Sequence, residues 1–183
     1  MDRKRRDINK HNRAGTNKLF DAIDKNSLED VKYLLECGAK INVRTIEPRG
    51  FIGAIQKVGY TTGSTPLHAA CLLGHLEITK TLLRYGPDIN ATNGAGFTPL
   101  DYALMGHDFE EKRLEKIKVS PFAFGSAKAH AEERLRLREE IVLCLQQAGA
   151  RSSYLALGRK FDAAASPAPA IEDLPPRKPS LKF

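Results

Sequence analysis

The stretch Thr65-Pro66-Leu67-His68-Ala69-Ala70, followed by Gly74-His75, decides the fold of this chain. Thr65 suits the position before a helix, because its hydroxyl can accept a hydrogen bond from the first turn. Pro66 suits the first helical position, where its missing N–H costs nothing. Gly74 can take the left-handed conformation that ends a helix. The sequence therefore predicts one short helix up to Gly74 and a second from Leu76 to Tyr85.

The same pattern returns 33 positions later. Thr98-Pro99-Leu100 lies 33 residues after Thr65-Pro66-Leu67, and Gly96 lies 33 residues after Gly63. This period, with its Thr-Pro-Leu-His start, resembles the ankyrin repeat family. The resemblance implies an all-α solenoid of helix–turn–helix repeats that binds other proteins. The residues that carry the structural motif are Thr65, Pro66, Leu67, His68, Gly74, Thr98, Pro99 and Leu100.

We count three repeats, at about residues 17–43, 61–92 and 94–152, within a repeat domain of residues 17–152. Two insertions interrupt them. The first is an extended hairpin loop at about 45–60, and the second is a helical insertion in the third repeat at about 108–137. Three repeats are about the minimum that buries a continuous core.

The two outer repeats depart from the motif in specific places. In the first, Asn26 takes the position of Gly74, and asparagine is the next best residue for a left-handed helix end. In the third, Asp101 replaces the motif's histidine. Gly106-His107, read as the end of that repeat's first helix, comes one residue early. A long helix is expected from Ser126 to about 148.

The basic character of the chain belongs to its ends. The net charge is +7, but residues 1–18 hold seven Lys or Arg against two Asp, and residues 159–183 hold five against three acidic residues. The residues between them carry 17 basic and 17 acidic side chains. A phosphate-binding groove is not expected in a neutral solenoid. We assign residues 1–16 to a basic disordered tail and 153–183 to a Pro- and Ala-rich tail, with a short C-terminal cap at its start as an option.

Composition also bounds the compartment. No run is long enough to span a bilayer, and the start of the chain lacks the apolar core of a signal peptide. Cys37, Cys71 and Cys144 have no spacing typical of disulfides or metal sites. We expect a cytoplasmic monomer with no transmembrane segment, metal or cofactor. The cluster Lys4-Arg5-Arg6 leaves nuclear import open, and the ending Ser180-Leu181-Lys182-Phe183 leaves secretion into a host cell open.

Nothing in the sequence predicts catalysis. It contains no paired carboxylates, nucleophile motif or glycine-rich phosphate loop. Under the family resemblance, His68 forms structural hydrogen bonds between adjacent turns. We therefore predict a protein that is not an enzyme and has no catalytic residues.

The candidate partner-binding residues are large apolar side chains at positions that the family varies to recognise targets. These positions precede the helix-ending glycine or flank the first glycine of each repeat, and an exposed apolar patch usually marks a binding surface. The first insertion adds apolar residues at the rim of the same groove. We predict binding of a protein or peptide in the concave groove and at the hairpin tips by Phe51, Ile52, Ile55, Tyr60, Leu72, Leu73, Phe97, Leu104 and Met105.

Three alternatives stay open at this point. The first insertion can cover the groove itself, and this does not exclude binding, since a loop can move aside for a tighter ligand. The chain can be a secreted bacterial ankyrin effector that acts on host proteins. It can also bind nucleic acid or an anionic surface through its basic tails, in which case binding would fall with salt and disappear on deletion of residues 1–18.

Overall fold

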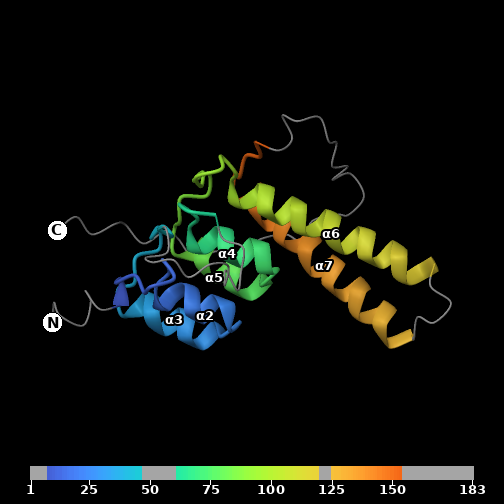
Figure 1. Ribbon diagram of the computed structural model, residues 1–183, viewed down its shortest axis with the longest axis horizontal. Helices are drawn as coiled ribbons and strands as arrows, with labels where there is room; N and C mark the ends of the chain where they lie inside the picture. The colour runs from blue at the N-terminus through green and yellow to red at the C-terminus, as the bar shows by residue number, and fades with distance from the viewer. Residues whose placement is uncertain (1–7, 47–60, 120–124, 154–183) are drawn as a thin grey trace.

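The computed structural model describes residues 8–46, 61–119 and 125–153. Consecutive helices pair as hairpins, and the three hairpins stack side by side (Figure 1). The first helices of the hairpins form one row and the second helices form another. The predicted all-α solenoid of three helix–turn–helix repeats is confirmed. The helices in the described residues are α2 (Lys18–Asp24), α3 (Leu28–Glu36), α4 (Pro66–Leu73), α5 (Leu76–Arg84), α6 (Pro99–Val119) and α7 (Gly125–Gln147).

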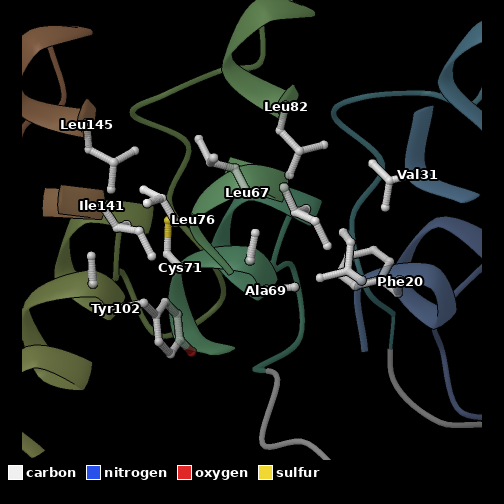
Figure 2. Close-up of a cluster of buried hydrophobic side chains, with 14 of the residues drawn as sticks. Phe20, Val31, Leu67, Ala69, Cys71, Leu76, Leu82, Tyr102, Ile141 and Leu145 are labelled. Atoms are coloured by element: carbon white, nitrogen blue, oxygen red, sulfur yellow. The ribbon is translucent and has the colours of Figure 1, made fainter. Parts of the chain in front are cut away.

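One hydrophobic core runs through all three hairpins (Figure 2). Phe20 and Val31 come from the first hairpin, Leu67 and Leu82 from the second, and Ile141 from the third. Each of these side chains is at most 1% exposed. Full burial of such a side chain contributes roughly 1.5–3 kcal/mol. The hairpins therefore stabilise one another across their shared faces. None of the helices in the described residues combines the length and apolar character needed to cross a bilayer.

The local signals of the second hairpin act as the sequence predicts. Thr65 precedes α4 in an extended conformation, and Pro66 occupies the first turn. Gly74 ends the helix with φ of +76°, in the left-handed region. Asn26 holds the equivalent position in the first repeat with φ of +53°. Both helix ends therefore use a residue that tolerates positive φ.

His68 links the second repeat to the third. Its Nδ1 accepts a hydrogen bond from the backbone N–H of Thr65 at 3.1 Å, so the ring proton lies on Nε2. Nε2 then donates to the carbonyl of Phe97 at 3.0 Å. Both ring nitrogens are used in holding one turn against the next. The ring is 1% exposed and meets the edge of Tyr102 at 5.7 Å between centroids.

Asp101 occupies the position of His68 in the last repeat, but toward the following segment it accepts hydrogen bonds where His68 donates one. It accepts hydrogen bonds from the N–H and hydroxyl of Thr98 at 2.7 and 2.9 Å, as His68 accepts from Thr65. Beyond it, the hydroxyls of Ser152 and Ser153 donate to the same carboxylate. A histidine can donate a hydrogen bond to a backbone carbonyl of the following repeat, as His68 does to Phe97. At Asp101 the neighbours are the hydroxyl groups of Ser152 and Ser153, which donate and therefore need an acceptor such as a carboxylate. The replacement of histidine by Asp101 follows from this change of neighbour.

Gly106 does not end the first helix of the third repeat, which corrects the sequence-based expectation. α6 continues through Gly106 to Val119, so it is 21 residues long, against eight in α4. α7 is 23 residues long and packs along it. The third hairpin is therefore a long two-helix arm that extends beyond the other two hairpins (Figure 1).

Gly106 serves a different purpose, because it makes room for Arg138 of α7. A Cβ at Gly106 would overlap the guanidinium of Arg138. That guanidinium donates to the carbonyls of Cys71 and Leu72, at 3.4 and 3.2 Å, in the last turn of α4. Carbonyls at a helix end have few or no partners within the helix and favour a cation, although that of Cys71 also accepts from the N–H of Gly74 at 3.3 Å. Arg138 therefore fastens the arm to the middle repeat.

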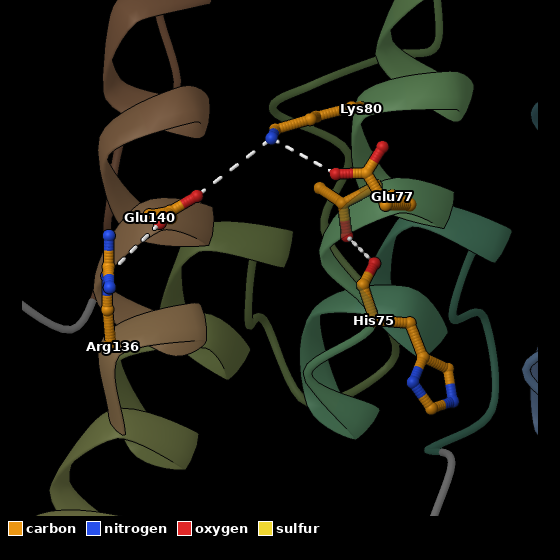
Figure 3. A network of polar contacts seen from close by, with 6 residues as sticks. His75, Glu77, Lys80, Arg136 and Glu140 are labelled. Carbon is orange, nitrogen blue, oxygen red and sulfur yellow. Dashed lines mark hydrogen bonds and ion pairs between the residues drawn. The ribbon is translucent and has the colours of Figure 1, made fainter. Parts of the chain in front are cut away.

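Buried and exposed ion pairs support this arrangement. Glu110 of α6 is 4% exposed and lies 3.2 Å from Arg134 of α7. Burial lowers the pKa of Arg138, and the charge of Glu110 opposes that shift. On the outer row, Lys80 of α5 lies 3.2 Å from Glu77 and 3.9 Å from Glu140 of α7 (Figure 3). These outer pairs are half-exposed and contribute little to stability.

We expect Arg138→Ala to lower the free energy of unfolding by about 1.5–3 kcal/mol, because it removes charge-assisted hydrogen bonds to two carbonyls. Arg136 provides the matched control, since it lies on the same helix with a side chain that is 73% exposed. Arg136→Ala should cost under about 0.5 kcal/mol. Urea denaturation followed by circular dichroism measures both, and equal losses would contradict the role of Arg138.

The effect of Gly106→Ala on the free energy of unfolding should depend on the residue at position 138 and should have opposite signs with arginine and with alanine there. In the native chain the new methyl group displaces the Arg138 guanidinium and destabilises the protein. In an Arg138→Ala background the guanidinium atoms nearest to the new methyl group are absent, and alanine should stabilise the helix by about 0.5–1 kcal/mol over glycine. A double-mutant cycle by the same denaturation method tests this, and the same sign in both backgrounds would contradict it.

We expect the stability of the protein to fall with acidification because of the buried His68 and the half-buried His75. Burial lowers the pKa of His68 and, together with the charge of Arg138, that of His75. In the unfolded chain both return to about 6.5. The unfolded state then binds more protons below that pH, so the free energy of unfolding falls as pH decreases, by up to about 1.4 kcal/mol per pH unit for each histidine. Denaturation from pH 7.5 to 5.5 measures this slope, and His68→Gln should reduce it. An unchanged slope in that variant would contradict the assignment.

Candidate partner-binding surface

Each repeat begins with a tight turn, and the turns of the first and third repeats are the same. Asn12 accepts hydrogen bonds from the backbone N–H groups two and four residues further on, at 2.9 and 3.1 Å. Asn93 does the same at 3.0 and 3.1 Å. Residues 8–16, which the sequence analysis assigned to a disordered tail, therefore contain the turn of the first repeat. The family motif at Thr65 gave no indication of it, because the first repeat lacks the Thr-Pro-Leu-His start.

In the second repeat the inserted loop interrupts this turn. Thr45 takes the place of the asparagine, and its hydroxyl accepts from the N–H of Ser64 at 3.0 Å. The hydroxyl also donates to the carbonyl of Thr61 at 2.9 Å, while the carbonyl of Thr45 accepts from Gly63 at 2.8 Å. The two ends of the insertion are thus joined at the tip of the turn. Phe51, Ile52, Ile55 and Tyr60 lie outside the described residues.

The three turns form a continuous ladder. The N–H of Ile46 donates to the carbonyl of Gly15 at 3.0 Å, and the N–H of Gly94 donates to that of Thr62 at 2.7 Å. A Cβ at Gly94 would lie 2.8 Å from this carbonyl oxygen, so only glycine fits there. Arg44 reinforces the ladder from its exposed side, since it donates to the carbonyls of Gly63 and Thr92. The insertion therefore emerges from a firmly bonded edge.

We call the row formed by the first helices of the hairpins, α2, α4 and α6, the inner row, and its accessible side the inner face. Each of these helices has one equivalent position on that face. The residues that precede the three helices are Asn17, Thr65 and Thr98, and the seventh residues after them are Asp24, Leu72 and Met105. Leu72 is half-buried, and Met105 is 39% exposed. These positions form a line along the inner face of the stack.

Phe109 extends this line onto the arm, and the sequence analysis did not identify it as a site residue. It lies one helical turn beyond Met105 on α6 and is 64% exposed. Residues four apart on a helix share a face. The i, i+4 spacing from Met105 was the available signal. The assignment of residues 108–137 to a helical insertion obscured it, because the first helix of the third repeat was expected to end before Phe109.

The structure corrects the prediction for Leu104, which is 3% exposed and lies in the core. Counting back from Gly106, which comes one residue early, predicts an accessible position for Leu104. Counting from the helix start instead aligns Leu104 with Cys71, which is fully buried. Leu104 therefore packs between helices and is not part of the accessible surface.

The other predicted groove residues are intermediate in exposure. Leu72, Leu73 and Phe97 are partly buried and pack against the core. The ring of Phe97 lies 6.1 Å from that of Tyr102 in an edge-on arrangement, between ring centroids. These three side chains are accessible in part. Met105 and Phe109 are the more exposed apolar residues on this face.

The arm contains one group of histidine and carboxylate side chains that could be considered as a metal site. His107, Asp108 and Glu111 bring potential metal-ligand atoms within 4.8 Å of one another. His107 is 8% exposed, with Nδ1 4.0 Å from Asp108 and Nε2 3.6 Å from Glu139. Exposed acidic groups gather at such spacing without an ion, and we assign none to this cluster. Both nitrogens of His68 are engaged in structural hydrogen bonds, so its ring has none left for acid–base chemistry.

Comparisons with known proteins agree with this geometry. A family model described as ankyrin repeats (many copies) matches residues 67–110. The chain is 35% identical over 110 residues to a protein of Rickettsia bellii named for its ankyrin repeats, covering 55% of this chain and 44% of the relative. It is 34% identical over 98 residues to protein phosphatase 1 regulatory subunit 27 of Homo sapiens, covering 54% and 53%. A 52-residue match at 46% identity to human ankyrin repeat domain-containing protein 13B covers 28% and 8%. The chain thus spans about half the length, or less, of these relatives.

We expect neighbouring residues Leu104 and Met105 to respond differently to truncation. Leu104→Ala should lower the free energy of unfolding by about 2–5 kcal/mol, because it leaves a cavity in the core. Met105→Ala should change it by under about 0.5 kcal/mol, as surface substitutions usually do. Thermal and urea denaturation compare the two variants. A larger loss in Met105→Ala would contradict the assigned register of α6.

Proposed function

We propose that this chain, an ankyrin-repeat protein, is a non-catalytic module that binds a partner protein along its inner face. Proteins built from these repeats are generally protein–protein interaction modules. The observation that carries the proposed site is the pair Met105 and Phe109, which lie exposed one helical turn apart on α6. Leu72 continues the pair toward the middle repeat.

The exposed pair has the properties of an interface centre. Surface hydrophobic residues scattered singly need no explanation, but adjacent large ones favour a contact site. Methionine adapts its shape to different partners, and aromatic residues contribute large contact areas. Burial of either side chain in a complex would contribute roughly 1.5–3 kcal/mol. A few such residues commonly supply most of the binding energy of an interface.

The turn ladder forms the proposed second part of the surface. The insertion at 46–60 emerges from the bonded edge at Thr45 and Thr61, next to the neighbouring turns. We propose that its apolar residues Phe51, Ile52, Ile55 and Tyr60, which lie outside the described residues, bind the partner or cover the groove residues Leu72, Leu73 and Phe97. We retain the hairpin tips in the proposed site for this reason. The partner on this reading is a protein or peptide.

The test replaces the exposed pair with charged residues. Met105→Glu combined with Phe109→Glu should weaken partner binding by about tenfold or more, because charge replaces apolar contact area. Partners are captured with the native chain by quantitative affinity purification, and binding of a captured partner is then titrated by fluorescence anisotropy. The far-ultraviolet circular dichroism of the variant should be unchanged, since both side chains are exposed.

The chain offers a matched control on its outer row of helices. Tyr33 of α3 is 65% exposed and Tyr85, just after α5, is 43% exposed, against 64% and 39% for the inner pair. Tyr33→Glu with Tyr85→Glu makes the same change in charge away from the inner face, and binding should be retained. Equal binding by native chain and inner-face variant would exclude the proposed site.

A further inference from the structure

The exposed face of α6 has a regular spacing. Met105, Phe109, Lys112 and Lys116 follow one another at intervals of four, three and four residues, and all four side chains are exposed. At 100° per residue these positions share one stripe. Glu110 and Leu114, which are buried, lie on the opposite side of the helix, and the buried Gly106 lies about 100° around the helix from Met105. Gly106 and Glu110 contact Arg138 and Arg134 of α7, so the exposed stripe faces away from α7.

The stripe changes character along its length. Its first half, at Met105 and Phe109, is apolar and joins the inner face of the stack. Its second half, at Lys112 and Lys116, is basic and lies on the arm. Among the described residues, no carboxylate forms an ion pair with either lysine, whereas Arg113 beside them lies 3.9 Å from Glu110. Both lysines are therefore available to an external carboxylate.

We infer that this stripe binds an amphipathic α-helix of the partner protein, with apolar residues against Met105 and Phe109 and carboxylates against Lys112 and Lys116. The inference rests on the proposed function and identifies its partner by chemistry. Alternating intervals of three and four are the spacing with which one helix packs along another. From Met105 to Lys116 the stripe rises by eleven residue steps, or about 16 Å at 1.5 Å per step, so about three turns of the incoming helix are in contact.

The charges beside the stripe favour a helix over a broad anionic surface. Asp108 and Glu115 lie along one flank of the row, next to Met105 and Lys112. A membrane or a nucleic acid presents negative charge over a wide area and would meet these carboxylates as well as the lysines. A helix with a narrow acidic stripe meets only the row itself.

The experiment selects helical peptides against the full chain. A displayed library of 18-residue helices, randomised at the contact positions, is selected on the native protein and on Lys112→Glu with Lys116→Glu. The native chain should enrich apolar residues in one half of the stripe and Asp or Glu in the other. The double variant should enrich Lys or Arg instead. Anisotropy titration of one enriched acidic peptide should show about a tenfold loss on charge reversal, and binding to the native chain should weaken with salt.

A control variant and a vesicle arm make the outcome decisive. Lys32→Glu with Lys40→Glu changes the charge equally on the first repeat and should bind the acidic peptide as the native chain does. Phosphatidylserine vesicles should show no lysine-dependent binding. Enrichment without acidic residues, no enrichment, or an affinity that charge reversal leaves unchanged would overturn the inference. Partner capture that depends on Met105 and Phe109 alone would leave the proposed function standing, so the two failures are distinguishable.

Discussion

The guanidinium of Arg138 joins three helices that local sequence signals build separately. It comes from α7, passes over Gly106 of α6 and donates to the last carbonyls of α4. Each contact depends on the others, because a side chain at Gly106 would displace the cation and a longer α4 would use the carbonyls itself. The arm therefore has a fixed relation to the middle repeat. The exposed face of α6 is held in line with the inner face of the stack as a result.

The two ends of the stack are closed by different polar devices. At the start, residues 8–16 supply the turn that precedes the first inner helix, and Ile46 bonds to Gly15. At the end, Asp101 accepts from the hydroxyls of Ser152 and Ser153. A terminal repeat has no neighbour on one side and must satisfy its hydrogen bonds in another way. These two segments do so with a few residues each.

The surface that remains accessible follows from this construction. The middle repeat buries most of its inner helix, whereas the lengthened α6 has a face beyond the reach of α4. Met105 lies where the two helices still run together, and Phe109 lies beyond it. On this face of α6, Met105 is 39% exposed and Phe109 is 64% exposed. A partner that contacts this face meets an apolar patch first and a basic row further along the arm.

The sequence by itself determined the helices of the stack, their period and the residues at their ends. Thr65, Pro66, Gly74 and Asn26 act through the backbone within a few residues, so their roles are readable from the chain alone. The same local reading failed at Gly106, where glycine looks like a helix end but serves close packing. Leu104 was misplaced as a direct consequence, and Phe109 was missed.

Only the tertiary structure decided which apolar residues are accessible and where the first helix of the third repeat ends, whereas the long helix expected from Ser126 to about 148 matches α7. Those outcomes depend on contacts between distant residues, such as Arg138 with Leu72, 66 positions apart. A pattern of residue types carries the propensity of a segment to form a helix. Whether one face of that helix is buried depends on which other helix lies against it, and that is settled by the packing of the whole stack.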